Sequence, residues 1–286
     1  MGPSGERFTE VPCPACGSRR FRPRFSGKGC TFVACRDCRL VYQNPQPRFA
    51  DLKGRYGQAY FEYEIRNEAN FHHLMELGLQ DIGFERLTRG LAAGRAFLDV
   101  GCATGMLLEG LRARGWRVQG VDLCRESAEF AARRGVPVFA GTLEQAGFPE
   151  AGFQVVHFSH LIEHVPSPTA FLAEVRRVLA PEGFAVVTTP NVDGLQARLF
   201  AGGWRSAIAD HLTLFSRRTL RRMLERAGFA VQAVQTWGGL AQGTAPPWLK
   251  RPADRLAKRL GFGDVVLMLA RPLPPRLAAG RLTRFF

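Results

Sequence analysis

Short apolar runs alternate with segments of helical periodicity through the middle of the chain. The run at residues 96–100 is followed by a glycine loop and by apolar positions at helical spacing, and a second run at 117–122 ends in Asp122. Strand, tight loop, helix and second strand together make a βαβ unit. The alternation continues, with expected strands at 153–159, 183–189, 229–237 and 264–272 and expected helices at 168–179 and 217–228. The pattern predicts an α/β protein.

The first part of the chain has another pattern, two Cys-x-x-Cys pairs. Cys13 and Cys16 form the first pair, and Cys35 and Cys38 form the second, with eighteen residues between the pairs. This spacing matches a zinc ribbon in which four thiolates surround one ion. We predict a structural Zn²⁺ held by these cysteines. Because four thiolates leave no open coordination position, the ribbon is expected to be a folding or docking element.

The composition argues against a membrane-spanning protein. The chain has 286 residues and is 46% hydrophobic, and no apolar stretch approaches the length that crosses a bilayer. The first ten residues lack the apolar core of a secretory signal, so we expect a cytoplasmic protein. The formal charge of +14 favours acidic partners, but the excess is spread over arginine pairs and changes this expectation little.

The glycine loop indicates the class of ligand. It reads Gly101-Cys-Ala-Thr-Gly105, with Ala103 where a dinucleotide loop has the glycine that approaches a pyrophosphate. Asp99 lies two residues before the loop, where a carboxylate would oppose a phosphate. Asp122 lies at the tip of the second strand, where an acid can bind ribose hydroxyls. An adenosine ligand with an ammonium and no phosphate fits, and S-adenosyl-L-methionine is such a ligand.

Several segments in order resemble class I S-adenosylmethionine-dependent methyltransferases. They are "FLDVGCATGMLLEGL", "GVDLC", the stretch from "GTLEQ" to "VVTTPN", and "DHLTLFSRRTLRRMLERAGF". The resemblance implies a Rossmann-like seven-stranded methyltransferase sheet whose last two strands pair antiparallel at its edge, with an N-terminal zinc-ribbon module. The expected domains are a zinc ribbon at 1–50, a helical linker or cap at 51–90, the methyltransferase domain at 91–272 and a basic tail at 273–286.

The resemblance also implies a set of cofactor-binding residues. Asp99, Gly101, Ala103 and Gly105 match the motif around the methionine moiety. The other matches are Asp122 for the ribose, Leu123 beside the adenine, and Thr142 and Leu143 at the adenine edge, and we expect the carbonyl of His160 to meet the methionine ammonium. Thr142 departs from the aspartate that is common in the family, and Ala103 departs from the commonest glycine.

The stretch "HLIEHV" carries three side chains that can hold or move protons, His160, Glu163 and His164. It follows the expected strand at 153–159, at the cofactor end of the sheet. Methyl transfer to a hydroxyl needs an aligned acceptor, exclusion of water and a group that takes the proton. The irregular segment at 201–216, interpreted as a mobile lid, carries His211. We predict His211 as the base with Asp210 as its orienter, and His164 as the second candidate.

Two other interpretations of this cluster stay open. Some members of the resembled family carry Glu-x-x-Glu-His with a distant His and bind a divalent ion; here His160 replaces the first Glu. An imidazole-rich set favours zinc, manganese or iron over magnesium. Alternatively, Glu163 and His164 only hydrogen-bond the turn. We rank a base or substrate contact first, the structural role second and the metal last.

Three further side chains are expected to be structural. Ser167 and Ser216 precede the helices at 168–179 and 217–228, where a serine side chain can cap the first turn. His157 lies inside the strand at 153–159 and is expected to pack in the core.

The expected function is methyl transfer from S-adenosyl-L-methionine to a small hydroxylated acceptor, such as a sugar, a glycan precursor or a secondary metabolite. The alternative is an RNA methyltransferase that docks through the ribbon and the basic surface. Against it, the fourth strand of the motif ends in "SHLI", without Asn-Pro-Pro-Tyr. A scaffold protein without activity is disfavoured because the cofactor motif is intact. Residues 246–260 interleave Trp248 and leucines with basic residues, which allows peripheral membrane contact, although packing on the chain's own domain is favoured.

Overall fold

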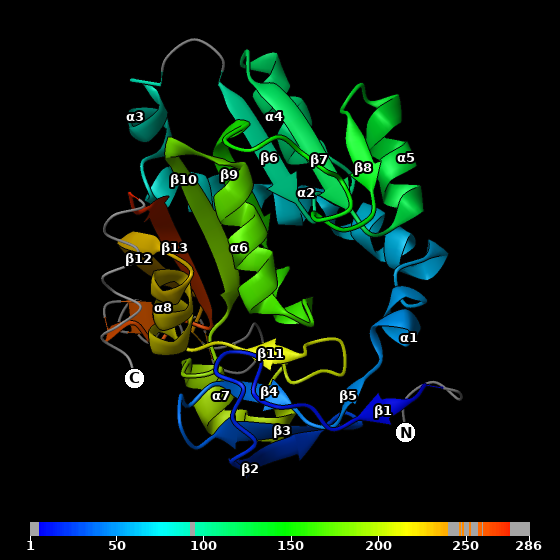
Figure 1. Cartoon of the computed structure of the whole chain (residues 1–286), viewed down its shortest axis with the longest axis vertical. Coiled ribbons are helices and arrows are strands. Elements are labelled where there is room, and N and C mark those ends of the chain that lie inside the picture. The colour runs from blue at the N-terminus through cyan, green and yellow to red at the C-terminus, as the bar shows by residue number, and fades with distance from the viewer. Residues whose placement is uncertain are drawn as a thin grey trace.

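The computed structural model describes residues 6–91, 95–239 and 260–274, together with positions 246, 248, 252, 257 and 258. A large α/β part and a smaller β-rich part lie at opposite ends of the long axis (Figure 1). Helices α1 (Phe49–Lys53) and α2 (Gln58–Asp81) connect the two parts along one side.

The large part is built on a seven-stranded sheet with the order β12-β13-β10-β9-β6-β7-β8. Strands β6 to β10 pair in parallel, whereas β13 is antiparallel to both β10 and β12. The predicted Rossmann-like sheet with an antiparallel edge pair is therefore confirmed. The bounds are β6 (Ala96–Val100), β7 (Arg117–Asp122), β8 (Val138–Ala140), β9 (Phe153–Ser159), β10 (Leu179–Pro190), β12 (Phe229–Trp237) and β13 (Val265–Pro272).

Both faces of this sheet are covered by helices, and each strand supplies side chains to both. In β6, Phe97 packs in the cluster that contains Leu108 of helix 106–113, and the next residue, Leu98, packs in the cluster that contains Leu172 of helix 168–178. Successive side chains of a strand point to opposite faces, which explains the division. The helices are α3 (Phe84–Thr88), α4 (Met106–Ala113) and α5 (Arg125–Arg133) with α2 on one side, and α6 (Pro168–Val178) and α8 (Arg217–Arg226) on the other.

The smaller part is a ribbon of short strands. Strands β1 (Phe8–Thr9) and β5 (Gln46–Pro47) form an antiparallel pair. A four-stranded sheet has the order β11-β4-β3-β2. Its strands are β2 (Phe21–Gly27), β3 (Cys30–Cys35), β4 (Val41–Gln43) and β11 (Thr213–Leu214). Strand β11 comes from far along the chain, so the ribbon sheet combines N-terminal and C-terminal segments.

The segment at 201–216 does not form the mobile lid that its irregular sequence predicted. Helix α7 (Leu195–Phe200) precedes it, and the 3-10 turn η2 (Ala201–Gly203) is its first part. Trp204, Ala207 and Leu214 are fully buried and pack with Phe32 and Val41 of the ribbon. Apolar side chains at irregular spacing fix this segment, because they bury against a second part of the chain that sequence periodicity does not reveal.

The two predicted helix caps have different outcomes. Ser216 caps α8: its Oγ accepts the Thr219 N–H at 3.1 Å, and Thr219 Oγ1 accepts the Ser216 N–H at 2.9 Å. Ser167 occupies the N-cap position of α6, but its side chain makes no capping hydrogen bond within the described part of the chain. The predicted side-chain cap at Ser167 was wrong, and Pro168 at the first turn removes one of the N–H groups that a cap would satisfy.

No helix among the described residues has the length and apolar character needed to cross a membrane. Most of the segment 246–260 lies outside the described residues; within it, Trp248 is 75% exposed. The basic tail beyond residue 274 also lies outside them. The division into domains stays a prediction, with the added fact that β11 completes the ribbon sheet.

Candidate active site

The glycine loop follows β6 and has a left-handed backbone at three positions. Gly101, Ala103 and Gly105 have φ values of 75°, 46° and 75°. A Cβ on Gly105 would lie 2.8 Å from the Cβ of Ala131 in α5, so this position requires glycine. The loop therefore turns tightly at the carboxyl end of the sheet, where α/β folds bind ligands.

Asp99 and His157 form a buried pair beneath this loop. They are register partners on β6 and β9, and the two atoms Asp99 Oδ1 and His157 Nδ1 lie 2.7 Å apart. Burial raises the pKa of Asp99, and the adjacent His157 opposes that shift. The prediction that His157 only packs was incomplete, because its imidazole satisfies the carboxylate. The expected place of Asp99 in the motif around the methionine moiety stays a prediction, as does the expected contact of the His160 carbonyl with the methionine ammonium.

Asp122 ends β7 and supports the loop through its carboxylate. Oδ2 accepts the N–H of Ala103 and Oδ1 accepts the N–H of Cys124, each at 2.8 Å. Burial raises the pKa of Asp122 to about 6, although both backbone donors oppose the shift. Leu123 follows and is half-buried, in line with a wall of an adenine site.

Thr142 and Leu143, which follow β8, have different surroundings: Thr142 lies in a turn and Leu143 in the core. Thr142 N–H donates to Gln145 Oε1 at 3.0 Å, which closes a local turn. Leu143 is only 1% exposed and packs in the main core. Thr142 is half-buried and is thus the more accessible of the two expected adenine neighbours.

Helix α2 brings residues to the site that sequence reasoning missed. Tyr60 and Glu64 are four residues apart and share one face of α2, and Tyr56 lies just before the helix. The rings of Tyr56 and Tyr60 lie 5.1 Å apart. Burial raises the pKa of Glu64 to about 7, Tyr60 opposes the shift and the nearby charge of Asp122 adds to it. The periodic spacing was a signal for this face, but the distant Asp122 beside it was not visible in sequence.

Glu163 is the centre of the cluster after β9. It lies on the 3-10 turn η1 (Ile162–His164) and is fully buried. Its Oε2 accepts the Thr189 hydroxyl at 2.8 Å. Its Oε1 lies 3.3 Å from Nδ1 of His160, without the alignment of a hydrogen bond, and finds no other partner among the described residues. Burial raises the pKa of Glu163, but the neighbouring histidines, His160 first, outweigh it and bring the value to about 2.

The sequence places His160 at the end of β9, and the structure gives it a strained backbone. Its φ is 51°, which is uncommon for a residue with a side chain, and its N–H donates to the Thr188 carbonyl at 2.8 Å. The ring is half-exposed, in contrast to Glu163. This bend turns the chain from β9 into η1.

His164 and His211 come together although 201–216 and η1 are distant in sequence. Their ring centroids are 4.7 Å apart, nearly perpendicular. Nδ1 of His211 donates to the Ser206 carbonyl at 2.8 Å, and Nδ1 of His164 donates to the Asp210 carbonyl at 2.9 Å. Both assignments follow from the carbonyl acceptors, which require an N–H at Nδ1. Each ring therefore keeps the lone pair of Nε2 free.

The predicted orienter of His211 was wrong. The carboxylate of Asp210 pairs with the guanidinium of Arg55, which also binds Glu6 with an N–O distance of 2.6 Å. The carbonyl of Ser206 orients His211 instead. Tyr56 was also missed: its hydroxyl lies 3.2 Å from Nδ1 of His164. The Ser206 carbonyl is a backbone atom, and Tyr56 is distant in sequence from His164, so the sequence contains no local signal for either contact.

Glu163, His164 and His211 form a convergent set. One potential ligand atom from each lies within 4.8 Å of the others. Burial lowers the pKa of His211 to about 4, and the adjacent His164 adds to this effect. At neutral pH the set therefore contains an ionised carboxylate and a neutral imidazole, which are suitable ligands for a divalent cation.

The four ribbon cysteines form the second convergent set, with sulfurs within 4.8 Å of one another. The Sγ atoms of Cys13 and Cys38 are 3.4 Å apart, and those of Cys16 and Cys35 are 3.6 Å apart. Four sulfurs about 2.3 Å from one zinc ion would be about 3.8 Å apart in a tetrahedron, so the arrangement fits zinc. The turn after each pair has a left-handed residue, and at the first pair this is Gly17 with φ 73°.

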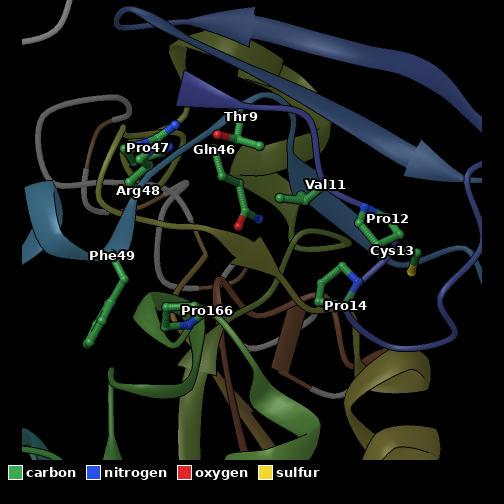
Figure 2. Close-up of a pocket in the computed structure, with 10 residues that line it drawn as sticks. All are labelled: Thr9, Val11, Pro12, Cys13, Pro14, Gln46, Pro47, Arg48, Phe49 and Pro166. Atoms are coloured by element: carbon green, nitrogen blue, oxygen red, sulfur yellow. The ribbon is translucent and has the colours of Figure 1, made fainter. Parts of the chain in front are cut away.

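A cavity of about 330 Å³ lies between the ribbon and the turn that follows His164 (Figure 2). The ribbon contributes Pro12 and Pro14, helix α1 contributes Phe49, and the turn contributes Pro166. The cavity is mainly apolar. The remaining lining residues are Thr9, Val11, Cys13, Gln46, Pro47 and Arg48.

Solved structures with the same fold are S-adenosylmethionine-dependent methyltransferases. One from Archaeoglobus fulgidus has a TM-score of 0.53 and 20% identity, and the match covers 75% of this chain and 100% of that one. Another from Thermotoga maritima has a TM-score of 0.52 and 21% identity, over 73% of this chain and 94% of that one. At this identity the likeness establishes the fold alone.

Curated relatives in sequence are ubiquinone biosynthesis O-methyltransferases. The protein from Bordetella bronchiseptica is 30% identical over 135 residues, which is 43% of this chain and 54% of that protein. The one from Psychrobacter cryohalolentis is 35% identical over 112 residues, which is 35% of this chain and 42% of that protein. The chain thus spans about half the length of the curated relatives that it matches.

A family model described as a methyltransferase domain matches residues 71–234, more than half of the chain. The matched segment contains the glycine loop, Asp122 and the turn with Glu163. The chain therefore belongs to the methyltransferase domain family and has the class I fold of S-adenosylmethionine-dependent methyltransferases.

Proposed function

We propose that this protein transfers the methyl group of S-adenosyl-L-methionine to a hydroxyl of a small acceptor. The observation that carries the proposal is the convergence of Glu163, His164 and His211. Glu163 and His164 follow the carboxyl end of β9, and the glycine loop follows the carboxyl end of the parallel strand β6. The O-methyltransferase names of the relatives support a hydroxyl as the methylated group.

The cofactor would lie across the carboxyl ends of β6 and β7. The loop from Gly101 to Gly105 would hold its methionine part, and Asp122 its ribose. The half-buried Leu123 and Thr142 would border the adenine, and Tyr60 and Glu64 of α2, which feel the charge of Asp122, would close the site on the side of α2. The sulfonium of the bound cofactor supplies the electrophilic methyl group, and the protein supplies alignment and exclusion of water.

A divalent cation held by Glu163, His164 and His211 is favoured over a lone histidine base. A general base works best with a pKa near the working pH, whereas the pKa of His211 is lowered to about 4. The same shift keeps the imidazole neutral and ready to bind a metal. The unpartnered Oε1 of Glu163 and the two Nε2 lone pairs are the donor set. This reverses the order in which we ranked the alternatives from sequence.

These residues would divide the work of the reaction. Ser206 and Asp210 hold the two rings through their carbonyls, and Thr189 holds Glu163. The bound cation would polarise the acceptor hydroxyl and lower its pKa. The half-exposed His160, whose Nδ1 lies 3.3 Å from Oε1 of Glu163, would provide the route by which the released proton reaches solvent.

The cavity in Figure 2 is the proposed space for the apolar part of the acceptor, because Pro166 lies two residues beyond His164. Its size is in the range of small-molecule sites. Phe49→Ala should therefore raise KM for the acceptor with little change in kcat. An unchanged KM would place the acceptor elsewhere.

We also infer that the four ribbon cysteines hold one structural zinc ion. The proposal rests on their spacing, on the sulfur separations and on the closed geometry of the set. Elemental analysis of the purified protein tests it together with the cation site. We expect one zinc that Cys16→Ser releases and a second divalent ion that Glu163→Gln releases.

The proposed activity is tested with methyl-labelled cofactor and a panel of phenols, catechols and sugars, with mass spectrometry of the products. We expect an O-methylated product with at least one acceptor class, and calorimetric binding of S-adenosylhomocysteine. Folded protein that fails to bind S-adenosylhomocysteine would contradict the cofactor assignment. Methylation of nitrogen or carbon alone would contradict the choice of a hydroxyl.

A further inference from the structure

The zinc ribbon and the turn that carries Glu163 both hydrogen-bond the backbone of one residue, Leu212. Leu212 follows His211 directly and precedes β11. Its N–H donates to the backbone carbonyl of Glu163 at 2.8 Å. Its carbonyl accepts the N–H of Gln43 at 2.9 Å and the side-chain Nε2 of Gln46 at 3.2 Å. The backbone of Leu212 is thus bonded to the turn η1 through its N–H and to the ribbon through its carbonyl.

These three hydrogen bonds are buried, so losing one would destabilise the structure. Leu212 is 1% exposed, and Gln43 and Gln46 are buried as well. When a buried carbonyl loses its donors, water does not replace them, and the unpaired group destabilises the arrangement. A displacement of the ribbon strand would therefore displace Leu212, and with it the neighbouring His211.

The ribbon strand itself is held by the cysteines. Strand β4 begins just after Cys38, and it pairs with β3, which ends at Cys35. The N–H of Cys35 donates to the carbonyl of Leu40 at 2.9 Å, which closes the loop between the two strands. On its other edge β4 pairs with β11, Tyr42 opposite Thr213. A metal that fixes Cys35 and Cys38 therefore also fixes the strand on which β11 and Leu212 depend.

We propose that the zinc ribbon is a positioning element of the methyl-transfer site, with Gln46 as its positioning residue. The zinc-held strand β4 and Gln46 hold Leu212, which sets the place of His211 relative to Glu163. This role rests on the proposed function. It extends the role of the ribbon from folding or docking to the geometry of catalysis.

Hydrogen–deuterium exchange on the full chain tests the coupling without an activity assay. Cys38→Ser is used to remove zinc, since a chelator would also strip a cation from Glu163. We expect the amides of Gln43 and Leu212 to exchange at least about tenfold faster, and those of β6 and β9 to change less than about twofold. S-adenosylhomocysteine affinity should be unchanged. Unaltered exchange at Leu212 in zinc-free protein would overturn the proposal.

Gln46→Met tests the coupling with zinc still bound. It removes one of the two donors to the Leu212 carbonyl and preserves side-chain size. We expect about fivefold faster exchange at Leu212 and a comparable fall in kcat, with unchanged KM for the cofactor. The matched control is Arg20→Ala, which removes an exposed ribbon ion pair with Asp37 and should change none of these.

The outcomes separate the two proposals. If Cys38→Ser unfolds the whole chain, the Gln46→Met variant decides, and exchange at Leu212 equal to that of the wild type overturns the coupling. If no acceptor is methylated but the exchange of Leu212 still responds to Cys38→Ser and Gln46→Met, the proposed function fails while the structural coupling holds. If kcat falls without any change in exchange, Gln46 acts by another route and the coupling is refuted.

Discussion

Glu163 combines complete burial with a strongly favoured negative charge. Its pKa is lowered to about 2 by the surrounding histidines, although burial alone raises it. Glu163→Gln preserves the shape and removes the charge, so we expect methyl transfer to fall by about 100-fold or more while S-adenosylhomocysteine affinity stays within about twofold. Single-turnover assays and calorimetry measure the two quantities.

The matched control for this substitution is Glu174→Gln on α6. Glu174 pairs with Arg177 at 2.6 Å on the surface of the helix, away from the site. Both rate and affinity should be close to those of the wild type in this variant. An equal loss of rate in the two variants would show that charge removal acts through general stability and not through the site.

The pKa of His211, lowered from its ordinary value of 6.5 to about 4, predicts a pH-dependent stability. The unfolded chain binds a proton near pH 6.5 that the folded chain does not bind until about pH 4. The contribution of this group to stability is therefore complete above pH 6.5 and is lost as the pH falls toward 4, by up to about 3 kcal/mol.

His211→Asn keeps a donor for the Ser206 carbonyl but does not titrate in this range. Urea unfolding at pH 7.5, 6, 5 and 4.5 should show that the free energy of unfolding of the wild type declines as the pH falls. The decline should be smaller in the variant. Parallel pH profiles for the two proteins would contradict the assignment of this shift to His211.

At the residue scale, the sequence indicated candidate residues that the fold brings together, but not the partners that hold them. Glu163 and His164 were recognised from one short motif, and His211 from the irregular segment that carries it. Ser206 and Tyr56 were missed because a backbone carbonyl has no sequence signature and Tyr56 lies 108 residues from its partner His164. Asp210 was assigned to its chain neighbour, whereas Arg55 binds it.

Helix α8 offers a test at the scale of the element. Ser216 and Thr219 make a reciprocal capping box at its start. Ser216→Ala should reduce the free energy of unfolding by about 1 kcal/mol, because a buried N–H loses its acceptor. Ser167→Ala at the start of α6 removes no capping bond and should change it by less than about 0.5 kcal/mol.

Chemical denaturation under identical conditions measures the loss in free energy of unfolding for each serine variant. Equal losses would mean that the capping bond contributes nothing measurable at Ser216. The comparison is matched because each serine occupies the N-cap position of a helix that packs on the same face of the sheet.

Strands and helices with strong periodicity were predicted close to their observed bounds. Strand β6 and strand β9 agree with the predicted ranges 96–100 and 153–159. Strand β11 could not be predicted, because a two-residue strand has no periodicity and its partner β4 belongs to another part of the chain. Long-range pairing overrides local sequence preference in such short elements.

At the scale of the whole molecule, the charge of +14 makes RNA binding the natural competitor to a small acceptor. We expect any binding of a mixed-sequence RNA to weaken by about tenfold or more between about 50 and 200 mM salt, and no methyl transfer to RNA at either concentration. Filter binding and labelled-methyl incorporation measure the two. Salt-resistant binding with methylation would establish the RNA alternative instead.

The arrangement of the two parts was only partly accessible from sequence. The cysteine spacing predicted the ribbon, and the resemblance to class I methyltransferases implied the sheet, since both depend on local motifs. The contact between them depends on Trp204, Ala207 and Leu214, whose apolar character was visible but whose partners in the ribbon were not. Tertiary packing decides such contacts, and one sequence does not encode them in a local pattern.

The ribbon sheet combines β2, β3 and β4 with the distant strand β11, which has a consequence for synthesis of the protein on the ribosome. Gln46 and Leu212 are separated by 166 residues. While the ribosome adds the residues between them, the edge of β4 that later pairs with β11 has no native partner. At typical elongation rates this interval lasts roughly 10 to 30 s. An open strand edge can pair with other chains, and early release of nascent chains that end before residue 212 should therefore yield aggregation-prone fragments.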